Sequence, residues 1–248
     1  MTMNSWVAPD DSDLRDALNG GRGPIVVFDP CGEFWTQFCQ ENRWRPWRAW
    51  RLTPGLSGEF DGWDVLSELK GVNSAAGCAV LAAALFPEAH NTELTRKLMG
   101  YVLAFADDSR HFSGLPELAG QLWADDLWTA IARWSRLYPQ HPALQSARAL
   151  LTLEGAGEAM LAIRYRMMIY HHPNVAETFD SDVGFSLSQL RLHPGQILFL
   201  TPGISCLEDP ELMAVYAFIT EALRELSALH HQPFTVFHPA RPPEGDMS

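Results

Sequence analysis

Lysine is scarce in this sequence: only Lys70 and Lys97 stand among 18 basic residues, against 30 acidic ones. The formal net charge of −12 makes the chain a poor match for nucleic acid, whose phosphates are neutralised by Lys and Arg. A basic protein partner fits this charge better, although solubility alone also accounts for it. We therefore do not expect nucleic acid to be the partner.

Long apolar runs are also missing. The longest, CAVLAAALF and ILFL, fall well short of the roughly 18 residues that a membrane-spanning helix needs. The acidic N-terminus MTMNSWVAPDDSD lacks the apolar core of a signal peptide. The four cysteines form no CxxC pair, which predicts buried free thiols in a reducing compartment. These absences predict a soluble, cytoplasmic protein with no membrane span.

The 248 residues, 47% of them apolar, can bury a large core. PIVVFD at 24–29 predicts a buried strand of a parallel sheet, because its apolar residues run without alternation. GEFWTQFCQENR predicts a helix with Phe34, Phe38 and Trp35 on one face, and RAWRLTPG at 48–55 predicts a second strand. This alternation of helices and strands is typical of an α/β fold.

From 73 to 172 the sequence has helical spacing throughout, with breaks at Pro and Gly positions. After about 183 the α/β pattern returns, with ILFL as a strand, PELMAVYAFITEALRELSAL as an amphipathic helix and QPFTVFHP as a last strand. We therefore predict a discontinuous α/β core formed by 1–72 and 176–240. An all-α domain at 73–175 is inserted into this core, and a disordered tail at 241–248 follows it.

Three stretches carry a resemblance to a known family. PIVVFDPCGEFW is similar to the strand and turn of type IV coupling ATPases, where an apolar run precedes Asp-Pro-Lys-Gly-Glu. RAWRLTPGLSGEFDGWDVL resembles their next strand, and the stretch from 180 to 226 resembles the segment where their chain re-enters the sheet. These motors feed DNA and protein into conjugation and type IV secretion machines. The resemblance covers about residues 20–240 and implies a bacterial protein with a RecA-like domain that carries an inserted helical domain.

The chemistry of that family requires two motifs that this chain lacks. A Walker A loop, G-x-x-x-x-G-K-[ST], binds phosphates and Mg²⁺, but residues 1–23 contain only GGRG with Arg22, interpreted as a helix end and turn. The counterpart of Walker B is PFTVFHPARP, which ends in His238-Pro239 where the family has two carboxylates. The resemblance therefore implies a relative without the phosphate site.

Asp29 and Glu33 remain at the first strand end, while Cys31 stands where the family has Lys. Asp29-Pro30 is also a good strand-ending turn by itself, which favours a structural role for these residues. Arg22, Asp29 and Glu33 are the candidates for a residual, non-standard phosphate site. A metal site at the adjacent His171 and His172 is disfavoured, because neighbouring helical residues point about 100° apart.

The segment RWRPWRAWR at 43–51 interleaves aromatic and basic residues. Such a segment can stack on single-stranded nucleic acid, but Trp and Arg are equally the residues of protein–protein hot spots. In so acidic a chain we favour protein contact. The predicted partner-binding residues are Trp44, Arg45, Trp47, Arg48, Trp50 and Arg51.

The expected function is that of a catalytically inactive coupling-ATPase-like protein without a cofactor. It binds a coupling ATPase or another type IV secretion component, either as a regulator of a coupling complex or as a fertility-inhibition factor. The alternative is a nucleotide-binding enzyme with a non-standard phosphate site. Binding or turnover of Mg-ATP by the pure chain distinguishes the two.

Overall fold

The structure is a computed structural model of the 248-residue chain. It describes residues 24–41, 49–56, 61–69, 74–87, 92–109, 111–179, 184–192, 196–229 and 235–237. The predicted helix at 9–19 and the predicted tail at 241–248 lie outside these ranges.

A four-stranded parallel sheet forms one end of the molecule. Its strands are β1 (Ile25–Phe28), β2 (Ala49–Leu52), β3 (Ile197–Leu200) and β4 (Thr235–Phe237), in the spatial order β2-β3-β1-β4. β1 pairs with both β3 and β4, and β2 pairs with β3, all in parallel. The predicted strands and the parallel α/β class are confirmed, since apolar runs buried on both faces belong in such a sheet.

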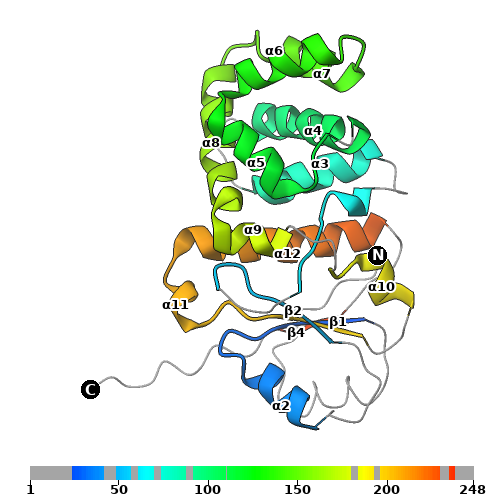
Figure 1. Cartoon of the computed structure of the whole chain (residues 1–248), viewed down its shortest axis with the longest axis vertical. Coiled ribbons are helices and arrows are strands. Elements are labelled where there is room, and N and C mark those ends of the chain that lie inside the picture. The colour runs from blue at the N-terminus through cyan, green and yellow to red at the C-terminus, as the bar shows by residue number, and fades with distance from the viewer. Residues whose placement is uncertain are drawn as a thin grey trace.

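The two faces of the sheet are covered by different helices (Figure 1). On one face, Phe34, Trp35 and Phe38 of α2 (Glu33–Glu41) pack against Ile25, Val27, Ile197 and Phe199. The ring centroids of Trp35 and Phe38 lie 5.3 and 5.5 Å from that of Phe199. The predicted apolar face of this helix is therefore confirmed. The other face is covered by α12 (Pro210–Leu229).

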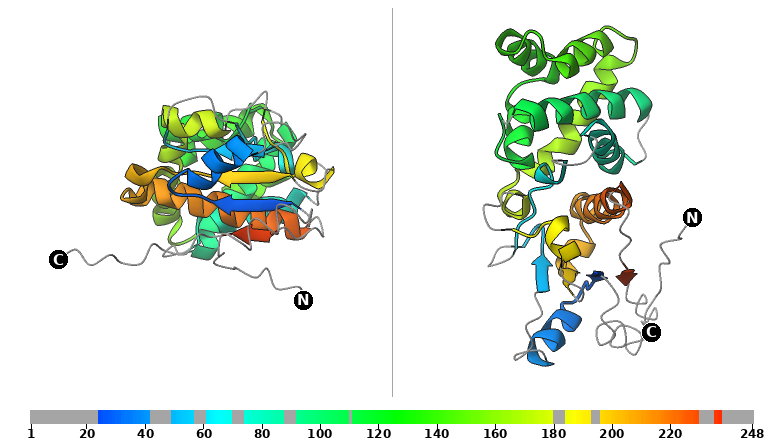
Figure 2. Two further views of the ribbon diagram at one scale, coloured as in Figure 1. Left: turned by 90° about the horizontal axis from the view of Figure 1, so that it is seen from below. Right: turned by 90° about the vertical axis from the view of Figure 1, so that its right-hand side faces the viewer.

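Most of the chain between β2 and β3 is helical, as predicted for 73–172, and α3 to α8 are stacked on the far side of α12 from the sheet, whereas α10 lies beside the sheet in a stretch predicted as a polar loop (Figures 1 and 2). The helices between the two strands are the short 3-10 helix η1 (Ser67–Leu69), α3 (Ser74–Leu85), α4 (Thr92–Ser109), α5 (Leu115–Ala124), α6 (Leu127–Leu137), α7 (Pro142–Leu150), α8 (Ala156–His171), α9 (Pro173–Phe179) and α10 (Leu187–Leu192). The short α11 (Ile204–Leu207) follows β3.

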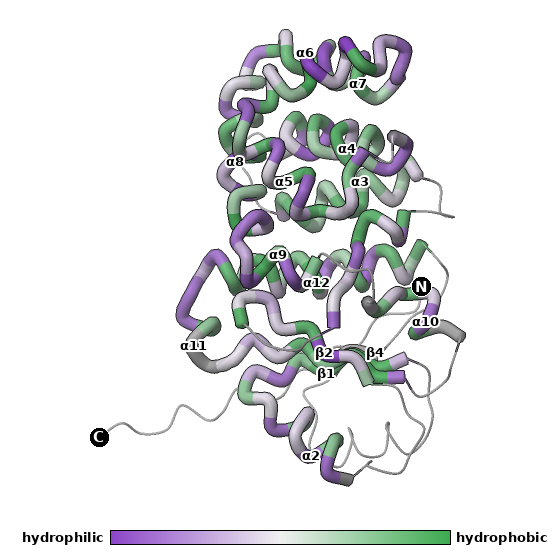
Figure 3. Tube along the Cα trace, viewed as in Figure 1, coloured by the Kyte–Doolittle hydropathy of each residue, from purple (hydrophilic) through white to green (hydrophobic). Residues whose placement is uncertain are grey.

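Several helix ends follow local rules that are visible in the sequence. Asp126 caps α6 by accepting a hydrogen bond from the Thr129 amide at 2.8 Å, and Pro142 occupies the first turn of α7. Gly155 precedes α8 with φ = 81°, a conformation that favours glycine. Hydrophobic and hydrophilic residues alternate along α6 and α7, whereas α3 is hydrophobic along most of its length (Figure 3). Accordingly, α3 is the more deeply buried of these helices.

One cluster of buried residues runs from the sheet into the helical region. It includes Val26, Trp50 and Leu198 of the sheet together with residues of α3, α4, α5, α6, α8 and α12. Phe105 lies at the centre of the helical part, with Trp134 and Tyr138 at ring-centroid distances of 5.2 and 5.4 Å. The RecA-like topology and the division into a core and an inserted domain remain predictions. Among the described helices, none is long and apolar enough to cross a bilayer.

Candidate functional site

The carboxylate at the end of β1 caps the helix that follows it. Asp29 is 1% exposed, and its two carboxylate oxygens accept hydrogen bonds from the amides of Glu33 at 3.1 Å and Trp35 at 2.9 Å. These amides belong to the first turn of α2, where helical N–H groups have no partner within the helix. Glu33 and Cys31 are exposed beside the turn. The predicted structural role of Asp29 is therefore supported by its geometry.

Burial raises the pKa of Asp29 above its usual value, while the hydrogen bonds from the amides of Trp35 and Glu33 lower it in part. A carboxyl group whose pKa is higher in the folded than in the unfolded protein stabilises the fold most at pH values below its unfolded pKa. That contribution is lost as the pH rises through the folded pKa.

Asp29→Asn should lower the free energy of unfolding by about 0.5–2 kcal/mol, because the amide can no longer accept both hydrogen bonds. The difference from the unsubstituted chain should be larger at pH 4 than at pH 7, since Asn does not titrate. Urea denaturation followed by circular dichroism at the two pH values measures both effects. An unchanged stability would show that the cap contributes nothing.

Arg51 of β2 reaches the edge of the sheet where the parallel strands end. Its Nε donates to Oγ1 of Thr201 at 2.8 Å, and its guanidinium carbon lies 5.4 Å from the centroid of the Trp35 ring. A Cβ on Gly32, which has φ = 70°, would lie 3.5 Å from Arg51 Nη2. The guanidinium of Arg51 thus lies near Gly32, which follows β1, and Thr201, which follows β3, and it contacts Trp35 of α2.

The ends of β1 and β3 form a topological switch point. The chain leaves β1 for α2 on one face of the sheet, and it leaves β3 for α11 and α12 on the other face (Figure 1). In open parallel sheets, ligands bind in the crevice at such a point. Arg51 and the buried Thr201 are two of the side chains at this edge of the sheet, together with Asp29.

The predicted partner-binding segment is only partly described. Trp44, Arg45, Trp47 and Arg48, like the candidate phosphate residue Arg22, lie outside the described residues. Trp50 is 2% exposed, and its Nε1 donates to Oε1 of Gln196 at 3.3 Å. The placement of Trp50 is therefore at odds with a direct partner contact, because a β-strand points alternate side chains to opposite faces and Trp50 points into the core.

Glu68 is a buried acid whose burial was not predicted from the sequence. It is 7% exposed, and its Oε1 accepts hydrogen bonds from Nε1 of Trp63 at 3.1 Å and from the amide of Leu187 at 2.7 Å. Trp63 lies close to Glu68 in the chain, whereas Leu187 is separated from Glu68 by 119 positions. Glu68 therefore joins the segment after β2 to the one that leads back to β3. WDVLSEL contains two acids among apolar residues, Asp64 and Glu68, and nothing in this pattern indicates which of them is buried.

A group of three exposed side chains and one half-buried arginine lies on α5 and α8. It comprises Trp123, Leu161, Arg164 and Tyr165, and we call it the α5–α8 surface. Leu161 and Tyr165 are 55% and 68% exposed and lie one helical turn apart. The guanidinium of Arg164 lies 5.2 Å from the centroid of the Trp123 ring. Exposed Trp, Tyr and Arg side chains are typical of protein-binding surfaces.

The four cysteines all lie in the part of the chain that the structure describes, two of them buried and two exposed. Cys78 and Cys206 are buried, and burial raises the pKa of the Cys78 thiol to about 12, whereas Cys31 and Cys39 are exposed. The prediction that the thiols are buried is thus wrong for two of the four, because both lie on the outer part of the turn and helix after β1. Within the described part of the chain, no group of three or more His, Cys, Asp or Glu side chains could hold a metal ion.

The strand that the resemblance pairs with Walker B is β4, Thr235–Phe237. His238 and Pro239, which follow it, lie outside the described residues. No protein-family model and no curated protein sequence matches this chain.

Proposed function

We propose that this protein works by binding another protein and that it does not hydrolyse a nucleotide. The proposed partner is a coupling ATPase or another component of a conjugation or type IV secretion machine. The resemblance in three stretches of sequence supports this partner. The parallel sheet with a helical segment between β2 and β3 is compatible with a RecA-like core that carries an inserted helical domain.

The state of Asp29 supports a non-catalytic role. Both of its carboxylate oxygens accept hydrogen bonds from the first turn of α2, so two amides that could bind a phosphate at this helix start are already engaged. A carboxylate held in this way is a helix cap rather than a ligand for Mg²⁺. The sequence also contains no Walker A motif that would supply another phosphate loop.

The observation that carries the proposal is the α5–α8 surface. An aromatic pair and an apolar side chain that remain exposed beside an arginine form a surface whose burial would contribute substantially to binding. Because three stretches of the sequence resemble those of a motor subunit, we propose that this surface takes part in a contact of the kind that motor subunits make with each other. A subunit without a phosphate loop would either regulate the coupling complex or stall it, as a fertility-inhibition factor does.

Leu161→Ala and Tyr165→Ala should each weaken the capture of a purified coupling ATPase by about tenfold or more, since truncated hot-spot residues cost about 2 kcal/mol. The measurement is surface plasmon resonance with the immobilised chain. Leu137→Ala is the matched control, because Leu137 is 62% exposed at the end of α6 and outside the surface. Equal affinities for the Leu161 and Leu137 variants would exclude this surface as the interface.

A second function is favoured by Arg51 at the switch point. A guanidinium beside a hydroxyl and a glycine turn at the ends of parallel strands is suited to binding an anion such as a phosphate. On this hypothesis the chain is a nucleotide-binding enzyme with a non-standard site, in which Arg51 replaces the missing phosphate loop.

Titration calorimetry with Mg-ATP distinguishes the two functions. If the protein only binds a partner, we expect no heat of binding at nucleotide concentrations up to about 1 mM, the upper end of the usual range of enzyme KM values. Micromolar binding that is lost in Arg51→Gln, or any release of phosphate by the pure chain, would overturn the non-catalytic proposal.

A further inference from the structure

A groove runs between α6 and α7, at the end of the molecule farthest from the sheet (Figure 1). It has a cavity volume of about 560 Å³, which lies within the range of ligand sites in proteins. Its floor is apolar, with the buried side chains of Ile131 and Leu151, and Trp128 is 51% exposed at one edge. It is formed by helices other than those that carry the α5–α8 surface.

The charge of this groove is opposite to that of the protein as a whole. Two arginines, Arg136 and Arg148, line it, and no Asp or Glu is among the lining residues. Both arginines are exposed, and neither has a hydrogen bond or ion pair within the part of the chain that the structure describes. In a chain with 30 acidic and 18 basic residues, two such cations around a groove whose lining has no carboxylate make that groove locally positive.

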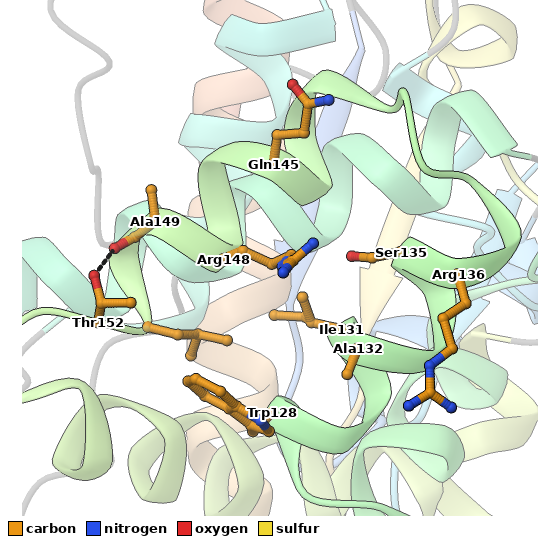
Figure 4. Close-up of a pocket in the computed structure, with 10 residues that line it drawn as sticks. Trp128, Ile131, Ala132, Ser135, Arg136, Gln145, Arg148, Ala149 and Thr152 are labelled. Carbon is orange, nitrogen blue, oxygen red and sulfur yellow. Dashed lines mark hydrogen bonds between the residues drawn. The ribbon is translucent and has the colours of Figure 1, made fainter.

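Two polar groups point into the same part of the groove (Figure 4). The guanidinium of Arg148 extends from α7 toward the hydroxyl of Ser135 on α6. Oγ of Ser135 is buried and has no hydrogen-bond partner among the described residues. A buried hydroxyl without a partner costs free energy, which a ligand that accepts its hydrogen bond would recover.

We propose that the groove between α6 and α7 binds an acidic peptide segment of a partner protein, with a carboxylate between Arg148 and Ser135 and a neighbouring apolar side chain against Trp128. The guanidinium matches a carboxylate because it can donate two parallel hydrogen bonds. The indole and the apolar floor favour a side chain next to the acid over a bare anion.

The test uses a fluorescein-labelled peptide, Gly-Glu-Leu-Glu-Phe-Glu-Gly, and fluorescence anisotropy with the full chain. We expect saturable binding that weakens about tenfold in Arg148→Gln, since a charge-assisted hydrogen bond is lost, and severalfold in Ser135→Ala. Binding should also weaken in 1 M salt, which screens exposed charges. Arg133→Gln is the matched control: Arg133 lies on α6, is paired with Asp125 and does not line the groove.

The affinity for the acidic peptide should be unchanged within about twofold in Arg133→Gln, because only the overall charge changes. Two further peptides separate the contribution of the carboxylates from that of the apolar side chains. One has Gln in place of each Glu, and the other has Ala in place of Leu and Phe. Both should bind more weakly than the original peptide. Binding that survives Arg148→Gln, or an equal loss in Arg133→Gln, would refute the site. So would tighter binding of a single-stranded oligonucleotide that is lost in Arg148→Gln, because the groove would then recognise phosphates.

Discussion

Phe218→Ala should lower the free energy of unfolding by about 3–5 kcal/mol, the range found when a buried phenylalanine is truncated. Phe218 lies on α12 and is 1% exposed. Its ring centroid lies 5.5 Å from that of Tyr170 on α8 and 6.0 Å from that of Phe179 on α9. The cavity would therefore open where the helical region packs on the layer that covers the sheet.

The same variant tests how the chain is divided. Because one buried cluster spans the sheet and the helical region, we expect circular dichroism and tryptophan fluorescence to report the same transition in urea. Two separated transitions would show that the helical region unfolds as an independent domain. A loss below about 1 kcal/mol would mean that Phe218 is not packed as described.

Tyr170→Phe serves as a control in the same aromatic cluster. The Tyr170 hydroxyl is buried without a hydrogen-bond partner in the described part of the chain. Burial also raises the pKa of this phenol, so it stays neutral at ordinary pH. Because the ring is kept and only an unsatisfied group is removed, Tyr170→Phe should not lower the free energy of unfolding.

Glu68→Ala should lower the free energy of unfolding by about 2–5 kcal/mol. The substitution removes the acceptor for two donors, Nε1 of Trp63 and the amide of Leu187, and each buried donor left without a partner costs about 1–3 kcal/mol. Trp63 is fully buried at 0% exposure, so water cannot easily replace the lost acceptor. Urea denaturation with linear extrapolation gives the difference.

Glu68→Gln separates the hydrogen bonds from the volume of the side chain. Gln keeps one acceptor oxygen and nearly the same shape, so its loss should be well below that of Ala. Equal losses for Gln and Ala would show that the carboxylate charge, rather than the acceptor, holds the two segments together. An unchanged free energy of unfolding in both variants would show that Glu68 does not stabilise the fold.

Local pattern was enough to predict most of the described elements, although α10 lies in a stretch predicted as a polar loop. Apolar runs such as Ile25–Phe28 and Ile197–Leu200 became parallel strands, because a strand buried on both faces has no polar face to alternate with. Asp29 was predicted to end the strand as part of a turn, and it caps α2. These predictions concern groups close together in sequence, whose geometry is governed by backbone sterics and local hydrogen bonds.

Contacts between distant segments could not be predicted in the same way. In the sequence, Trp50 is one of several Trp and Arg residues in a short segment. In the structure it is buried, because β2 pairs with β3 and its Nε1 donates a hydrogen bond to Gln196. The groove between α6 and α7 has no motif, since Ser135 and Arg148 come together only through helix packing.

The parallel α/β class, the helical stretch between β2 and β3 and the lack of a Walker A motif follow from the order of residue types, because each depends on the residues present within a short window. Which side chains remain exposed, how Glu68 joins two distant segments and where two arginines line one groove depend on the fold. Burial and electrostatic potential arise from neighbours in space, and a linear order of residues does not specify those neighbours.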